Sequence, residues 1–136
     1  MTQSNPGYVV DSNAVKRVTA DAAVSAYQMV VWTSEGHVTN PAANNNVQKF
    51  AGFVKDQNIA ANGEGEIICF GEALAKLGDT VTVGAILENQ AITGIMYPTA
   101  HTAGDVIQFI AKALKAGDSG EVIPVQILDS ATQYNA

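Results

Sequence analysis

Residues 116–125, AGDSGEVIPV, decide the expected fold, because the same order of residue types stands earlier in the chain at residues 62–70, NGEGEIICF. Each stretch follows an apolar run, FAGFVK at residues 50–55 and FIAKAL at residues 109–114. Glycine accepts positive φ in a turn, acidic side chains face water and an aliphatic run packs inward. The repeat therefore predicts two corners of strand, turn and strand, with glycines at the turn positions.

The repeat also decides an ambiguous segment, residues 105–115. Its apolar residues are spaced as in an amphipathic helix that begins at an Asp N-cap, although a strand is compatible with them too. By analogy with residues 50–55, the segment is expected to be mostly strand.

Further strands are expected where β-branched and aromatic residues gather between Gly, Asn and Pro. Residues 72–77 alternate as a strand would but contain good helix formers, so both assignments stay open. The pattern favours a mainly β domain, a compact barrel or sandwich with at most one or two short helices. The other expected strands are residues 27–33, 37–39, 48–54, 67–71, 80–83, 85–87 and 91–97.

The length of 136 residues suits one domain with a flexible or partner-bound extension. The start of the chain is polar and rich in turn formers, with one short apolar patch, so residues 1–23 are expected to form an extended N-terminal arm. Residues 24–128 are expected to form the β domain, and residues 129–136 a C-terminal tail.

Composition excludes several classes of partner. Only 15% of the residues are charged, against 47% hydrophobic, so much of the surface must be neutral, which suits contact with other proteins. The net charge is -6 and the seven basic residues are scattered, so nucleic acid is not an expected partner. The polar N-terminus has no signal-peptide core, and no apolar run approaches the roughly 20 residues of a membrane span, which predicts a soluble protein made in the cytoplasm.

The chemistry-bearing residues do not form a recognisable site. Cys69 lies within an apolar run and is expected to pack in the core, while His37 and His101 stand in no metal-binding spacing. The sequence contains no phosphate-binding, nucleophile or dithiol motif, so neither an enzyme nor a cofactor is predicted. The nearby carboxylates are interpreted as solvated turn acids rather than as acid–base or calcium groups: Glu64, Glu66, Glu72 and Asp79.

Two alternatives come from other classes. Residues 78–87, GDTVTVGAIL, are similar to a stretch of biotinyl and lipoyl carrier domains, but the lysine that those domains modify is missing. A carbohydrate-binding module is the main rival hypothesis, against which stands ordinary packing in apolar strands. Its sugar-stacking face would use Tyr27, Trp32, Phe50, Phe53, Phe70 and Tyr97.

Over residues 24–128 the order of these elements resembles the small head decoration proteins of tailed phages, whose core is described as a β-tulip. The resemblance does not rest on catalytic residues. It rests on the succession TSEGHV at residues 33–38, GFV at 52–54, GEGEII at 63–68, LGDTV at 77–81 with Gly84-Ala85, AITG at 91–94, and the pair of runs at 109–114 and 116–125.

The resemblance implies a homotrimeric capsid cement protein, synthesised in the host cytoplasm and carried on the outer surface of the virion. Such a trimer would bind the major capsid protein at three-fold or quasi-three-fold positions and stabilise the expanded icosahedral shell. The arm would be its gripping element, either flexible or pairing with a neighbour's backbone. The residues expected to contact the capsid are Tyr8, Val9, Val10, Val15, Lys16, Arg17 and Val18.

Overall fold

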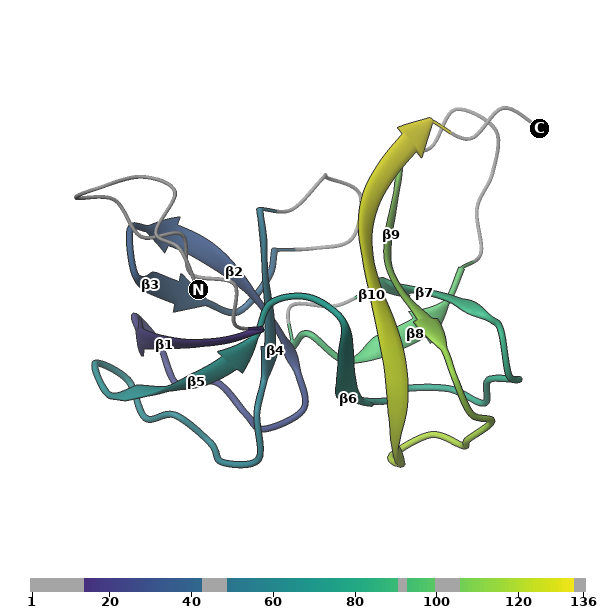
Figure 1. Ribbon diagram of the computed structural model, residues 1–136, viewed down its shortest axis with the longest axis horizontal. Helices are drawn as coiled ribbons and strands as arrows, with labels where there is room; N and C mark the ends of the chain where they lie inside the picture. Colours follow the sequence, from purple (N-terminus) through teal and green to yellow (C-terminus); the bar gives the residue numbers. More distant parts are fainter. Residues whose placement is uncertain (1–13, 43–48, 91–92, 100–105, 134–136) are drawn as a thin grey trace, which may run out of the picture.

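The computed structural model describes residues 14–42, 49–90, 93–99 and 106–133, which form ten strands and contain no helix (Figure 1). The mainly β, barrel-like fold is thereby confirmed. Within these ranges there is consequently no helix that could cross a membrane. The strands are β1 (Val15–Ala20), β2 (Met29–Ser34), β3 (His37–Thr39), β4 (Phe50–Val54), β5 (Glu64–Ile68), β6 (Glu72–Lys76), β7 (Ile86–Asn89), β8 (Met96–Pro98), β9 (Val106–Ala113) and β10 (Val122–Gln133).

The first five strands close into a barrel in the order β1-β3-β2-β4-β5. Strands β1 and β3 are parallel, and every other neighbouring pair in the barrel is antiparallel. The barrel interior is small and is filled by aliphatic side chains that alternate with outward-facing polar ones. It contains Val18, Ala20, Val24, Val30, Val38, Ala51, Val54, Ile59 and Ile67.

The last five strands form an antiparallel sheet in the order β6-β10-β9-β7-β8, which stands beside the barrel in Figure 1. A second, larger core lies between the two. It combines Met29 and Phe53 of the barrel with Leu87 and Ile110 of the sheet, all with an exposed fraction of 1% or less. Because this core draws on both parts, the barrel and the sheet form one folding unit.

One turn occurs four times among the described residues, and we refer to its occurrences as turn units one to four: residues 24–27, 59–62, 81–84 and 117–120. In each, the residue after the turn donates its backbone N–H to the carbonyl three positions back, over 2.8 to 3.3 Å. Each unit begins with a residue in an isolated bridge, which is Val24, Ile59, Val81 or Gly117. The last residue of each unit has positive φ: Tyr27 (66°), Asn62 (65°), Gly84 (85°) and Gly120 (88°).

The turn units work in pairs. Units one and two are joined by reciprocal backbone bonds between Val24 and Ile59, and units three and four by the same bonds between Val81 and Gly117. In both pairs the strand that enters one unit lies against the strand that leaves the other: β1 with β5 and β4 with β2, then β6 with β10 and β9 with β7. The barrel and the second sheet are therefore built on the same swapped pair of corners.

The expected corners formed, but their glycines do not correspond. Strands β4 and β5 pair antiparallel, as do β9 and β10, so both corners of strand, turn and strand are confirmed, and so is the strand assigned to residues 105–115. Positive φ falls on Gly120 in the second corner but on Asn62 in the first, where the prediction placed it on glycine. The comparison of the two sequences pairs Gly120 with Gly65, whereas in the structure Gly120 corresponds to Asn62, three residues earlier.

Two other expectations need revision. Residues 80–83 were expected to form a strand because they alternate, yet residues 81–83 belong to turn unit three, which ends at Gly84 with φ of 85°. The strands also pass the expected domain bounds: β1 lies inside the segment 1–23 that was assigned to the arm, and β10 extends to Gln133. Residues 1–13 lie outside the described part of the chain.

Candidate binding surfaces

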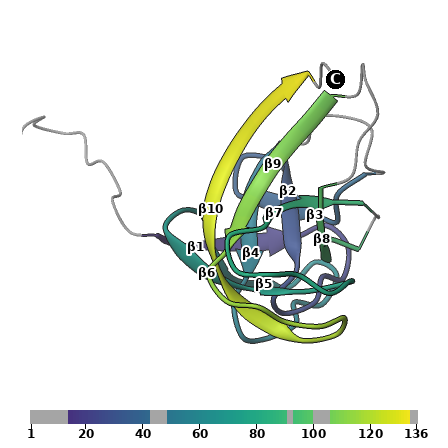
Figure 2. The ribbon, with the colours of Figure 1, turned by 90° about the vertical axis from the view of Figure 1, so that its right-hand side faces the viewer.

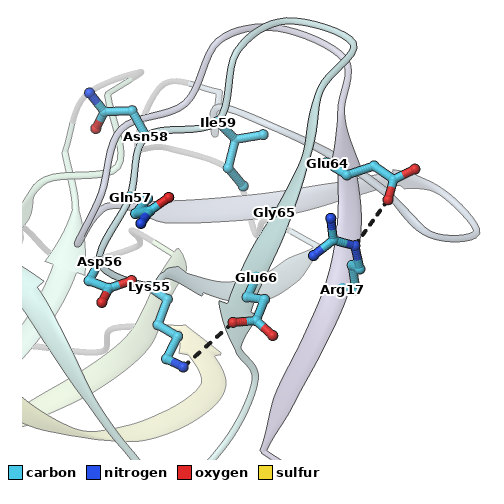
Figure 3. Close-up of a pocket in the computed structure, with 9 residues that line it drawn as sticks. All are labelled: Arg17, Lys55, Asp56, Gln57, Asn58, Ile59, Glu64, Gly65 and Glu66. Atoms are coloured by element: carbon cyan, nitrogen blue, oxygen red, sulfur yellow. Dashed lines mark hydrogen bonds and ion pairs between the residues drawn. The ribbon is translucent and has the colours of Figure 1, made fainter.

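A polar pocket of about 260 Å³ opens on the outside of the barrel (Figure 3). Arg17 of β1 and Glu64 to Glu66 of β5 form one side, and residues 55–59, which lead into turn unit two, form the other. Figure 3 shows two ion pairs in the pocket. Arg17 Nε lies 3.0 Å from Glu64 Oε1 on the same side, and Lys55 Nζ lies 3.5 Å from Glu66 Oε1 on the opposite side.

These two ion pairs limit what the pocket can bind. Their side chains are between 44% and 65% exposed, so each pair contributes little to stability. Each cation already faces a carboxylate and Asp56 adds a third acid, so the pocket has a small excess of negative charge and offers no unpaired basic group to an anionic ligand. The pocket is best described as a solvated polar surface of the barrel.

A second polar cluster joins three barrel elements. Asp21, just after β1, accepts a hydrogen bond from the Thr33 hydroxyl at 2.5 Å and lies 2.8 Å from His37 Nδ1. The Thr33 hydrogen bond, followed by that of His37, lowers the pKa of Asp21. The imidazole and the hydroxyl bind opposite oxygens of one carboxylate, so neither acts on the other, and the cluster ties β1 to the β2–β3 hairpin.

The exposed large hydrophobic residues gather away from the barrel's strands. Leu74 of β6 is 44% exposed and Leu114, just after β9, is 39% exposed. Pro124 of β10 lies between them, and Leu74, Pro124 and Ile68 line an open hollow of about 180 Å³. The remaining exposed ones lie on the link after β5, in turn unit three and on β10: Phe70, Val83, Val122 and Leu128.

This apolar surface was not among the sequence-based candidates. The signal was present in Glu72 to Lys76, where Ala73 and Ala75 alternate with Leu74. In the strand the two alanines face the core and the leucine faces solvent, the reverse of what hydrophobicity alone favours. The strand therefore presents a large apolar side chain to solvent while small residues fill the core beneath it.

The structure separates the expected capsid-contact residues. Tyr8, Val9 and Val10 lie outside the described ranges. Val18 is 3% exposed in the barrel interior, so its side chain has no access to a partner. Val15 and Lys16 are half-buried in β1, and Arg17 is exposed in the pocket beside Glu64.

The remaining candidates form no reactive centre in the part of the chain that the structure describes. The Cys69 side chain is half-buried and packs against the barrel core. His101 lies outside the described residues, and those that are described contain no cluster of three metal-ligating side chains. Glu64 and Glu66 form the two ion pairs of the pocket, and Glu72 and Asp79 are exposed.

The aromatic residues do not share one face. Phe50 and Phe53 are buried and pack edge to face, with ring centroids 5.8 Å apart at 66°. Tyr27, Trp32 and Tyr97 are half-buried on three separate elements. Phe70, the exposed member of the set, lies on the link between β5 and β6. The arrangement matches core packing better than a platform for sugar rings.

No protein-family model and no curated protein matches the chain. The fold is similar to that in the crystal structure of the N base of the head fiber gp8.5 of bacteriophage phi29. The TM-score is 0.60 at 15% sequence identity, and the match covers 88% of this chain and 98% of that chain. At this level of identity the similarity concerns the fold.

Proposed function

We propose that this chain is a structural, non-enzymatic protein of a phage head. The observation that carries the proposal is the fold similarity to a head-fiber base, because it spans nearly all of that chain as well as most of this one. Independent support comes from the order of elements that resembles the decoration proteins of tailed phages.

In its finer form, the proposal is a homotrimeric decoration protein on the outer surface of the virion, with the major capsid protein as its partner. A protein that binds the expanded shell in preference to other states stabilises that shell by mass action, and contact with several capsid subunits at once strengthens the effect. The low fraction of charged residues, 15%, and the exposed leucines favour extensive protein contacts. The β-tulip assignment stays a prediction.

The arm remains the proposed gripping element, now confined to the residues before β1. Residues 1–13 include Tyr8, Val9 and Val10, whereas a deletion that reached residue 20 would remove a barrel strand. Deleting residues 1–13 is therefore the informative variant. It is expected to fold as the full chain does and to bind heads more weakly, and unchanged affinity would exclude a gripping role for the arm.

The decisive experiment titrates the purified full chain onto expanded heads that lack it. Saturation at a number matched to the symmetry of the icosahedral lattice is expected, together with a higher temperature of shell disruption. Failure to bind, or binding without a defined stoichiometry, would refute the head-surface role. A glycan array separates the carbohydrate-binding alternative, which the scattered aromatic residues do not favour.

A further inference from the structure

The outward face of β6, β10 and β9 carries two ordered rows of side chains. In one row Leu74 is the partner of Pro124 on β10, and Leu114 donates its backbone N–H to the Pro124 carbonyl at 3.0 Å. In the next row Gln126 is the partner of Glu72 on one side and of Lys112 on the other. Figure 2 shows β9 and β10 side by side, seen from the flank of the molecule.

One row carries opposite charges on the two sides of β10, and both rows follow each other in the same direction on β6 and β9. Glu72 and Lys112 are both exposed and stand on the two strands that flank β10, about 10 Å apart at ordinary strand spacing. Both β6 and β9 run antiparallel to β10, so they run in the same direction as each other. Going from Glu72 to Leu74 therefore follows the same direction as going from Lys112 to Leu114.

The fold itself does not require apolar residues on this face, because the barrel holds charged residues at the equivalent positions. Arg17 is the partner of Glu66 in the barrel as Leu74 is of Pro124 in the sheet. Lys55 donates its N–H to the Glu66 carbonyl at 3.0 Å, as Leu114 does to that of Pro124. One face of the repeated architecture thus forms the polar pocket, and its equivalent is an exposed apolar row.

Exposed apolar surface of this kind is typical of contacts between permanently associated subunits, which are more apolar than transient interfaces. We propose that the face formed by β6, β10 and β9 is the surface through which a second copy of this chain associates. The copies are related by rotation about an axis that runs along these strands. The β9 side of one copy lies against the β6 side of the next.

This arrangement matches both rows at once. Rotation about an axis along the strands keeps every residue at its height, so Lys112 of one copy meets Glu72 of the next, and Leu114 meets Leu74. The hollow beside Leu74, about 180 Å³, offers room for the leucine of the neighbouring copy. A twofold axis in the plane of the face and across the strands would reverse the order of the rows, so that the charged row and the leucine row could not both meet their matching row.

Contacts of this kind can close into a ring of two, three or another small number of copies. Only the number three is taken from the proposed function, so the inference rests on that function in this one respect. The surface itself is argued from the two rows. Self-association and head binding are therefore measured separately, so either one can fail alone.

The first test replaces the leucines with the residues that the barrel uses at the same places. Sedimentation of the full chain over a range of concentrations is expected to show an oligomer, with three copies as the favoured number. Leu74→Arg and Leu114→Lys should each raise the dissociation constant about tenfold or more, as loss of a central interface contact does. Ala61→Arg adds the same charge at an exposed barrel turn and should leave association unchanged.

The second test reverses the charges. Glu72→Lys or Lys112→Glu alone should weaken association, because like charges then meet across the interface, and the double variant should restore it. Near-ultraviolet circular dichroism and the urea midpoint of each variant verify that the fold is retained. Rescue in the double variant is a result that a merely structural role of either residue would not produce.

A monomeric wild-type protein would overturn the inference even if it binds heads. The inference would also fail if Leu74→Arg and Leu114→Lys sediment as the wild type does, or if the two charge reversals add instead of compensating. Association through this face without any binding to heads would support the inference and refute the proposed head function instead.

Discussion

Gly94→Ala should destabilise the protein more than any substitution that only strains the backbone, because Gly94 lies where the sheet half meets the barrel. Met29 at the start of β2 donates its N–H to the Gly94 carbonyl at 2.8 Å. A Cβ at Gly94 would overlap the backbone oxygen and nitrogen of Met29, and φ at Gly94 is 77°. Backbone atoms of a central strand cannot rotate away, so β2 or the segment at Gly94 must shift.

Gly36 is the matched control. Its φ is 76° and no atom lies within 4 Å of the place where a Cβ would stand. Positive φ costs an alanine about 1–2 kcal/mol at either position. The forced shift at Gly94 adds about 1–3 kcal/mol, as overpacking does. Gly94→Ala should therefore lose about 2–5 kcal/mol of unfolding free energy, and Gly36→Ala about 1–2 kcal/mol.

Urea denaturation followed by Trp32 fluorescence measures both losses, provided that the slope with urea stays constant. Equal losses in the two variants would show that the approach of Gly94 to β2 is not a tight contact. The inferred coupling of the two halves through this contact would then be refuted.

Phe53→Ala should cost about 3–5 kcal/mol, because its ring is fully buried in the core between the two halves. Phe70→Ala, at a position 48% exposed, should cost below about 1 kcal/mol, and urea midpoints compare the two. The hydrogen bond from Thr33 lowers the pKa of Asp21, so its stabilising contribution is present above about pH 4 and lost as the pH falls through the folded-state pKa. Thr33→Val should raise the pKa of Asp21 in an NMR titration, and an unchanged pKa would contradict the assignment. Asn89 is 6% exposed, and its Oδ1 has no hydrogen-bond partner among the described residues, so Asn89→Asp should cost about 3 kcal/mol at pH 7 and less in acid, as thermal unfolding at two pH values would show.

Most strands could be predicted because turn formers separate runs of β-branched and aromatic residues. The hairpin of β2 and β3 was expected from the turn at residues 34–36, and Gly36 has φ of 76° there. The segment 105–115 was assigned to strand by analogy with residues 50–55, and β9 covers most of it. These features depend on neighbours in sequence, which is why the local pattern was sufficient.

The swapped pairing could not be predicted, because it depends on which turn unit binds which. All four units have the same backbone turn, yet the residues with positive φ are a tyrosine, an asparagine and two glycines. Tyr27 has no sequence signature of a left-handed residue and was expected to begin the strand 27–33, so unit one was not recognised. Unit three was hidden by the alternation of residues 80–83, which is the same pattern that a half-buried strand shows.

The same swap explains why the carrier-domain likeness of residues 78–87 carries no functional weight. This stretch contains turn unit three, in which Val81 forms the bridge to Gly117 as Val24 forms the bridge to Ile59 in the barrel. A valine that enters the bridge and a glycine that accepts positive φ are what this corner needs to be closed, whatever the protein does. The informative differences between the halves therefore lie on their outward faces, where the backbone imposes nothing. There the barrel carries Arg17 and Glu66, whereas the sheet carries Leu74 and Pro124. This contrast is the reason for proposing the sheet as the half through which copies associate.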